Sequence, residues 1–147
     1  MSAPRHVVVA ADGGGRFLVD TSAWLDALQP RAGREEVRER VRRLVADDRV
    51  VTIGAVRAEV LRGTRDEAEY RRLSGMLDAL TRMPTEERDW EAAARLGLTL
   101  RRAGTTVGLA DLVLAAVAIR HGVTVLHADA DLDRVARHSR LVVESYV

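Results

Sequence analysis

The sequence has 147 residues, 47% of them hydrophobic, and a formal net charge of +1, a composition typical of one globular domain. It contains no cysteine, which excludes disulfides and thiolate metal sites. No apolar run is long enough to cross a bilayer, and the N-terminus lacks the pattern of a signal peptide, so we expect a cytoplasmic protein without a membrane partner.

Arginine supplies all of the positive side-chain charge, because the 23 basic residues include no lysine. Guanidinium groups suit planar, bidentate contacts with phosphate. The codon usage of a GC-rich genome is the simpler explanation of the same bias. The absence of lysine still excludes any mechanism that requires a lysine side chain.

The chain is predicted to open with a flexible leader over residues 1–15, which contains AADGGG, so that a single domain spans residues 16–147. A short apolar run predicts a buried strand over residues 16–20. A short helix is expected over residues 23–28, with Ser22 as the residue best placed to cap it.

The middle of the chain is mainly helical. Residues 34–48 predict an amphipathic helix, whose inner face carries Val37, Val41, Leu44 and Val45. A short strand over residues 49–52 and a helix that ends at Leu61 follow. Another helix is expected over residues 65–80, where leucines recur at helical spacing.

The last part of the chain begins with a long helix over residues 86–103. The next helix, over residues 108–121, is apolar on nearly all sides and is therefore expected to be buried. Strands over residues 123–126 and 141–143 flank a short helix over residues 130–137. Strands that alternate with helices predict an α/β fold, in which helices cover both faces of a mostly parallel sheet.

Four carboxylates stand where core elements begin or end, and a buried carboxylate is unfavourable unless it is paired or coordinates a metal. Asp20 and Asp129 follow two predicted strands, and Asp111 is the one charge in residues 108–119. Glu59 lies in a short helical pattern. Since ligands of open α/β sheets bind beyond the carboxyl ends of the strands, these acids predict a shared pocket for a divalent cation and phosphoryl-transfer chemistry.

Each of these acids also has a structural interpretation. Asp20 is a possible helix cap, although Ser22 is better placed for that role. Glu59 lies among arginines and is compatible with a solvated helix face that forms minor ion pairs. Asp111 is a possible cap of the helix that it begins.

The segment around Asp129 superficially resembles the start of a calcium-binding loop, because Asp129, Asp131 and Asp133 alternate with other residues. Such a loop requires glycine where Arg134 stands and glutamate where Arg140 stands, so this interpretation is discarded. At least one of Asp129 and Asp131 is expected to face the pocket.

The arginines that flank Glu59 are the best candidates for contacts with phosphate, namely Arg57, Arg62 and Arg65. His127 lies near the predicted acidic edge. For this histidine a structural role is favoured over contact with a substrate.

Several segments, in their order and spacing, resemble PIN-domain ribonucleases and are most similar to the VapC-type toxins of prokaryotic toxin–antitoxin pairs. These segments are LVDTSAWLD (18–26), AEVLRG (58–63), GLADLVLAAVAIRHGVTVLHADADLDRVA (108–136) and the closing Leu141-Val142-Val143. The resemblance covers about residues 16–146. The departures from the family pattern are Leu132, which replaces a frequent aromatic residue, and a longer leader.

The resemblance implies a PIN-like three-layer α/β/α sandwich and a set of site residues. The four acids of the family pattern fall on Asp20, Glu59, Asp111 and Asp129, which would be the catalytic residues. A Mg²⁺ or Mn²⁺ ion would be held by Asp20, Asp111, Asp129 and the auxiliary acid Asp131. Supporting or substrate-contacting roles would fall on Thr21, Ser22 and Arg62.

The resemblance further implies an endoribonuclease that hydrolyses RNA phosphodiester bonds, forms homodimers and arrests growth unless a cognate antitoxin blocks its acidic cleft. Transfer RNA, a ribosomal RNA loop and messenger RNA all remain open as substrates. The alternative is a PIN-fold module for RNA processing, or for non-catalytic binding of RNA or protein. Receivers and haloacid-dehalogenase-like phosphatases are disfavoured, because the chain lacks a late lysine and a D-x-D motif after its first strand.

Overall fold

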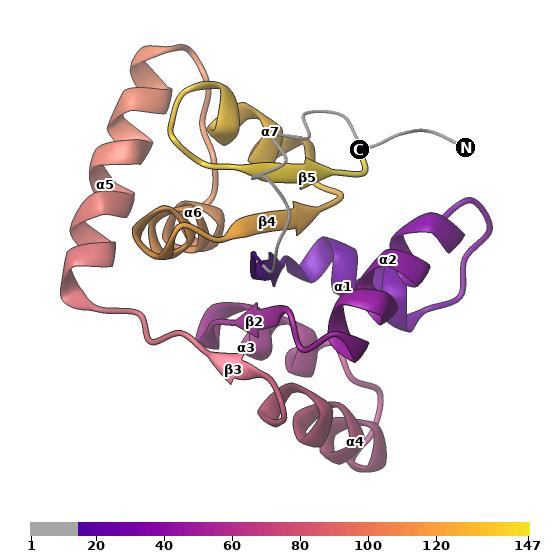
Figure 1. The fold of residues 1–147 in the computed structure, drawn as a ribbon. Coiled ribbons are helices and arrows are strands. Elements are labelled where there is room, and N and C mark those ends of the chain that lie inside the picture. The colour runs from indigo at the N-terminus through magenta and orange to yellow at the C-terminus, as the bar shows by residue number, and fades with distance from the viewer. Residues whose placement is uncertain (1–14) are drawn as a thin grey trace.

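The computed structural model describes residues 15–147, so the predicted leader, except for Gly15, lies outside the described residues. A five-stranded parallel sheet runs through the described chain in the order β3-β2-β1-β4-β5 (Figure 1). Its strands are β1 (Phe17–Val19), β2 (Val50–Thr52), β3 (Thr81–Arg82), β4 (Thr124–His127) and β5 (Val143–Ser145). β1 lies at the centre, so that the early strand β1 and the late strand β4 become neighbours.

Within residues 15–147, seven helices cover this sheet (Figure 1). They are α1 (Thr21–Leu28), α2 (Glu35–Ala46), α3 (Gly54–Arg62), α4 (Glu67–Asp78), α5 (Glu87–Arg102), α6 (Leu109–His121) and α7 (Ala130–Arg137). α1 packs on α2 and α3, and α3 packs on α4, whereas α6 packs on both α5 and α7. In the order β3-β2-β1-β4-β5, the right-handedness rule for crossovers between parallel strands assigns these two groups to opposite faces of the sheet, in agreement with the predicted three-layer α/β/α sandwich.

Two strands differ from the sequence-based prediction. No strand was expected at Thr81–Arg82, because both side chains are exposed and two residues give no detectable alternation. The last strand is Val143–Ser145 rather than residues 141–143. Leu141 is buried, but it precedes the segment that pairs with β4, and its apolar character shifted the predicted boundary.

The inner face of α2 is narrower than predicted. Val37, Val41 and Leu44 are buried, whereas the side chain of Val45 is 38% exposed, so the prediction for Val45 is wrong. Val45 lies about 100° around the helix from Leu44, beyond the stripe that contacts the core.

The helix α6 is buried along most of its length, as its apolar sequence predicts. Every residue from Leu112 to Ala118 is buried. Gly122 ends the helix with a φ of 66°, a left-handed conformation that glycine adopts without strain. Packing of the residues from Leu112 to Ala118 therefore fixes the axis of α6, whose first turn carries Asp111. No helix in the described part of the chain has the combination of length and apolar character that crossing a membrane requires.

An ion pair joins α5 to the last turn of α6. Arg120 donates from Nε to Asp89 Oδ1 over 2.7 Å and from Nη2 to Asp89 Oδ2 over 2.8 Å. The buried Asp89 also accepts the Glu86 backbone N–H at the start of α5. Its hydrogen bonds with Arg120 hold the pKa of Asp89 below its usual value. The pair therefore fixes the position of α6 relative to α5.

Replacing Arg120 by methionine would leave the Asp89 carboxylate buried without its charged partner. We expect R120M to lower the free energy of unfolding at neutral pH by about 3 kcal/mol, measured by urea denaturation. Because the pKa of Asp89 is depressed in the folded state, this stabilisation is present above about pH 3.9, the unfolded pKa, and is lost as the pH falls through the folded value. As the pH is lowered, the free energy of unfolding of R120M should therefore fall less than that of the unaltered protein.

The matched control is Arg95→Met. Arg95 pairs with Glu91 over 3.2 Å on the exposed face of α5, so its loss should cost less than about 1 kcal/mol. Equal losses of stability in the two variants would contradict the proposed contribution of Arg120.

Candidate functional site

The parallel pairing of β1 with β4 brings two of the predicted acids to one edge of the sheet. Val19, the last residue of β1, lies opposite Leu126 in β4, and the Asp20 backbone N–H donates to Leu126 O over 2.9 Å. Asp20 directly follows β1, and Asp129 follows shortly after β4. Both acids therefore lie beyond the carboxyl ends of neighbouring strands, where ligand sites of such sheets form.

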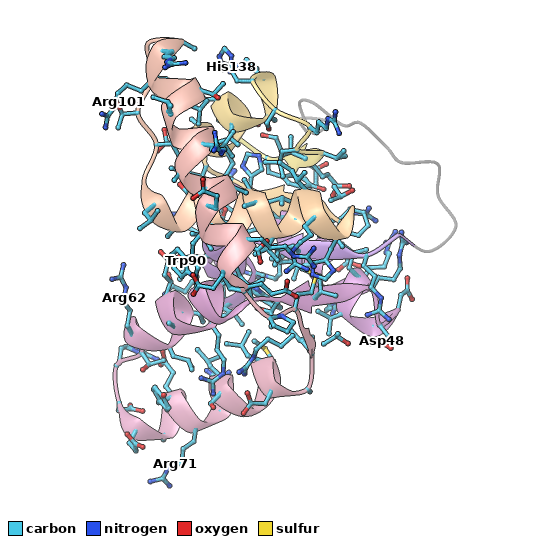
Figure 2. All side chains as sticks on the ribbon, turned by 90° about the vertical axis from the view of Figure 1, so that its left-hand side faces the viewer. Asp48, Arg62, Arg71, Trp90, Arg101 and His138 are labelled. Carbon is cyan, nitrogen blue, oxygen red and sulfur yellow. The ribbon has the colours of Figure 1, made fainter. Side chains whose placement is uncertain are left out.

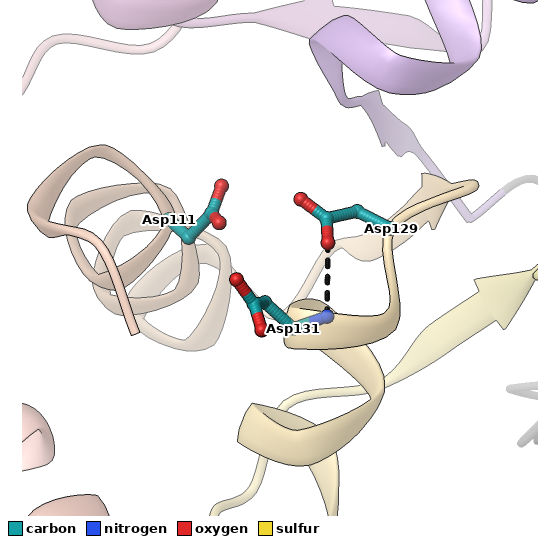
Figure 3. Close-up of side chains that lie close together, drawn as sticks. All are labelled: Asp111, Asp129 and Asp131. Carbon is teal, nitrogen blue, oxygen red and sulfur yellow. Dashed lines mark hydrogen bonds between the residues drawn. The ribbon is translucent and has the colours of Figure 1, made fainter. Parts of the chain in front are cut away.

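Two further acids reach this edge from helix starts, since Asp111 and Asp131 lie in the first turns of α6 and α7. Carboxylate oxygens of Asp111, Asp129 and Asp131 all lie within 4.8 Å of one another. We call these three residues the acidic cluster. Figure 3 shows their side chains converging, with Asp129 Oδ1 accepting the Asp131 backbone N–H over 2.9 Å.

Asp20, rather than Ser22, caps α1, so the preference for Ser22 as the cap is wrong. Asp20 Oδ2 accepts the Ser22 backbone N–H over 3.1 Å and the Ser22 hydroxyl over 2.6 Å. The Ser22 oxygen in turn accepts the Ala128 backbone N–H over 3.0 Å. Ser22 therefore ties the loop after β4 to the loop after β1 and orients the buried Asp20 carboxylate.

Glu59 approaches the site from α3. Thr21 donates its hydroxyl to Glu59 Oε1 over 3.4 Å, a long contact that connects α1 to α3. The Glu59 side chain is 34% exposed, so it lies at the rim of the site rather than in its interior.

Negative charge accumulates around Asp111. Burial, together with the carboxylates of Asp20, Asp129, Asp131 and Glu59, raises the pKa of Asp111 to about 7. The structure therefore brings all five predicted acids to one site, where Asp111 is only partly ionised at neutral pH. A cation would favour the ionised form, and carboxylate oxygens are the ligands that hard divalent cations prefer. The donor set of the acidic cluster thus fits a divalent metal.

The arginines near the site differ in how they are held. Arg134 forms an ion pair with Asp131 along α7. Arg62 is 80% exposed and lies 4.0 Å from Glu59, so its guanidinium is accessible to a ligand. The other two predicted phosphate contacts are held by residues of α4: Arg57 binds Asp78 and Ser74, and Arg65 binds Glu69. Of the three arginines, Arg62 is therefore the best candidate for a contact with phosphate.

His127 is fully buried at the end of β4, in keeping with a structural role rather than contact with a substrate. Burial lowers the pKa of His127, so its ring is neutral at neutral pH. Two residues beside it, Asp133 on α7 and Ser145 in β5, were not among the predicted site residues. Their spacing in sequence gives no signal, because only the docking of α7 and β5 against β4 brings them to the histidine.

Comparison with known proteins identifies the family. The PIN domain model matches residues 17–138. Ribonuclease VapC11 of Mycobacterium tuberculosis is 35% identical over 134 residues, which cover 88% of this chain and 98% of that protein.

Two solved structures share the fold at low sequence identity. VapBC2 from Rickettsia felis, bound to a DNA fragment from its promoter, gives a TM-score of 0.71 at 16% identity, covering 89% of this chain and 98% of that chain. Mycobacterium tuberculosis VapC20, a toxin that cleaves the sarcin–ricin loop, gives a TM-score of 0.60 at 18% identity, covering 85% of this chain and 98% of that chain.

The matched range runs from β1 through α7 and so contains every element that carries an acid of the site. The likeness to VapC11 extends over nearly the whole of both chains. The chain therefore belongs to the PIN-domain family, among its VapC ribonucleases.

Proposed function

We propose that this protein is a metal-dependent endoribonuclease that hydrolyses RNA phosphodiester bonds and acts as the toxin of a toxin–antitoxin pair. The observation that carries the proposal is the acidic cluster, with carboxylate oxygens of Asp111, Asp129 and Asp131 within 4.8 Å of one another. Its relatives in the mycobacteria are VapC ribonucleases, which supports the same chemistry.

The acidic cluster would hold Mg²⁺ or Mn²⁺, with Asp20 and Glu59 completing the acidic surroundings. When bound, such an ion activates water and stabilises negative charge on a phosphate that undergoes hydrolysis. We assign catalytic roles to Asp20, Glu59, Asp111 and Asp129, and metal-binding roles to Asp20, Asp111, Asp129 and Asp131.

Neighbouring side chains hold the catalytic acids in position. Ser22 fixes the Asp20 carboxylate through its 2.6 Å hydrogen bond, and Thr21 contacts Glu59. Arg62 is exposed at the rim, where it would bind the phosphate backbone of the RNA and position it without reading bases. The chain contains only two Trp, two Tyr and one Phe, of which Trp24 and Phe17 are buried, so recognition by the shape of a folded RNA is favoured over base stacking.

The proposed regulatory partner is a cognate antitoxin that covers the acidic cleft. The solved relative from Rickettsia felis is a VapBC assembly on promoter DNA, which supports a role of such a complex at the operon. An RNA substrate and an antitoxin partner would both be met in the cytoplasm, which is the location we propose. The proposed nuclease domain spans residues 16–147.

We further propose a homodimer that forms through α5 and the start of α6. Trp90, Leu98 and Leu109 are 47%, 48% and 60% exposed there, unusually high values for large apolar side chains. Figure 2 shows Trp90 on the face of the molecule turned toward the viewer. A second copy would remove these side chains from water.

The central test is the cleavage of total cellular RNA by the purified protein with Mn²⁺ or Mg²⁺. Asp20→Asn and Asp111→Asn should each reduce the rate on the order of a thousandfold, because each removes a charge that supports the metal. Asparagine is also a good helix cap, so D20N should keep α1 intact. EDTA should abolish the discrete fragments seen with the unaltered protein.

The matched control is Asp47→Asn, which changes an exposed aspartate at the C-terminal end of α2, and it should cleave at the unaltered rate. The non-catalytic binding module would be favoured if the folded, unaltered protein cleaved no RNA with either metal. In that case D20N should bind RNA as tightly as the unaltered protein does.

The raised pKa of Asp111 predicts the pH dependence of stability in the metal-free protein. Between about pH 3.9 and about 7 the folded protein keeps a proton that the unfolded chain releases, so stability falls as the pH rises through this window. In EDTA, Asp111→Asn should therefore melt at a higher temperature than the unaltered protein at about pH 8 and at the same temperature at about pH 4. Parallel melting curves across this range would contradict the raised pKa.

The dimer is tested by the replacement Leu98→Glu, which places a charge in the proposed interface. We expect L98E to be monomeric in sedimentation equilibrium, at concentrations at which the unaltered protein is dimeric. Val45→Glu is the control, because Val45 is exposed on the separate helix α2 and should leave the dimer intact. A dimer that survives L98E would exclude this surface.

A further inference from the structure

A continuous chain of buried polar side chains lies beneath the acidic cluster. It consists of His127 at the end of β4, Asp133 on α7 and Ser145 in β5, which are 0%, 5% and 0% exposed. Burial of such groups is costly unless they bond to one another, so their contacts restrict the local structure strongly.

Both ring nitrogens of the histidine face polar groups. Its Nδ1 accepts the Asp129 backbone N–H over 3.0 Å. Its Nε2 lies 3.1 Å from Asp133 Oδ1. Neither of these two atoms forms a hydrogen bond among residues 15–147, so electrostatic attraction between a ring N–H and a carboxylate links them over this distance. On the far side, Ser145 Oγ donates to Asp133 Oδ2 over 3.0 Å.

The direction of these contacts determines the tautomer of the ring. A backbone N–H can only donate, so Nδ1 of His127 carries no proton and the single ring proton lies on Nε2. A carboxylate can only accept, so Asp133 favours a proton on Nε2. The hydroxyl of Ser145 holds that carboxylate in place. From Ser145 in β5 to the loop that carries Asp129, each donor therefore faces an acceptor.

We propose that His127 is a positioning residue for Asp129, which it holds in the acidic cluster by accepting the Asp129 backbone N–H in the tautomer that Asp133 selects. Asp129 is then held at both ends, since its Oδ1 also accepts the Asp131 backbone N–H over 2.9 Å. The inference rests on the proposed function, in which the Asp129 carboxylate binds the metal. His127 would contribute by fixing the geometry of that carboxylate, without contacting the RNA itself.

Two substitutions of His127 distinguish the roles of its two ring nitrogens. In His127→Asn the amide oxygen takes the place of Nδ1 and can still accept the Asp129 N–H. In His127→Gln the amide nitrogen takes the place of Nε2 and can still donate to Asp133, but the acceptor for Asp129 is lost. A role in packing alone would not distinguish these variants in this order.

The experiment is a calorimetric titration of the full chain with Mn²⁺, with Asp129→Asn as the reference for a damaged site and thermal melting as the check of folding. We expect H127Q to bind Mn²⁺ about tenfold more weakly than the unaltered protein, a loss typical of outer-shell partners, and H127N to remain close to it. Equal affinities of H127N and H127Q, whether both retained or both lost, would overturn the proposal.

Amide hydrogen exchange at Asp129 in the metal-free protein tests the hydrogen bond itself. We expect slow exchange in the unaltered protein and in H127N, and fast exchange in H127Q. Equal exchange in the two variants would overturn the inference. If the unaltered protein binds no Mn²⁺ although its Asp129 amide is protected, the proposed function fails while the positioning contact stands.

Asp133→Asn provides a second variant that leaves the histidine unchanged. Ser145 would donate to the amide oxygen of the new side chain, which turns its NH₂ group toward Nε2 of His127. Nε2 must then accept, so the ring proton moves to Nδ1 and the bond to Asp129 breaks. We expect the Nδ1–H tautomer in ¹⁵N NMR and weakened Mn²⁺ binding. An unchanged tautomer with unchanged binding would overturn the role of Asp133.

Discussion

Repulsion among the carboxylates gathered where β1 and β4 end is the interaction that the rest of the structure must accommodate. Its clearest sign is Asp111, whose pKa rises to about 7 because the site is buried and surrounded by other acids. The fold holds these groups together through backbone pairing of β1 with β4, the hydroxyl of Ser22 and the buried body of α6. Stability is thus given up locally in order to place charge where a cation can bind.

The buried and half-buried acids within residues 15–147 differ in their partners. Asp26, Asp89 and Glu144 each contact an arginine: Asp26 is bound by Arg31 and Arg34, Asp89 by Arg120 and Glu144 by Arg40. The buried Asp20 and the half-buried Asp111 and Asp129 have no arginine partner within residues 15–147, and the buried Asp133 contacts His127 and Ser145 instead. Asp26, Asp89 and Glu144 are thus neutralised by guanidinium groups, whereas Asp20, Asp111 and Asp129 converge on a single edge of the sheet without one.

Sequence patterns predicted the sheet, most of the helices and the five acids, because apolar periodicity and charges at element ends are local signals. They did not predict β3, which has two exposed residues, or the exposure of Val45, which depends on how widely α2 contacts the core. The partners of His127 were also missed. Asp133 and Ser145 meet the ring only through tertiary packing, and no local pattern encodes such a meeting. The roles of the acids themselves stay predictions that the proposed experiments test.

Four acids of the site lie where helices begin: Asp20 and Asp129 cap α1 and α7, and Asp111 and Asp131 lie in the first turns of α6 and α7. The aligned peptide dipoles of a helix give its N-terminus a partial positive charge, which stabilises a nearby anion by about 0.3–1 kcal/mol. The backbone itself therefore offsets part of the repulsion without any ion. Unlike a zinc finger, which is unfolded without its metal, a site built in this way would not require the ion for folding. Metal supply would then govern the activity of the chain while leaving its folded structure intact.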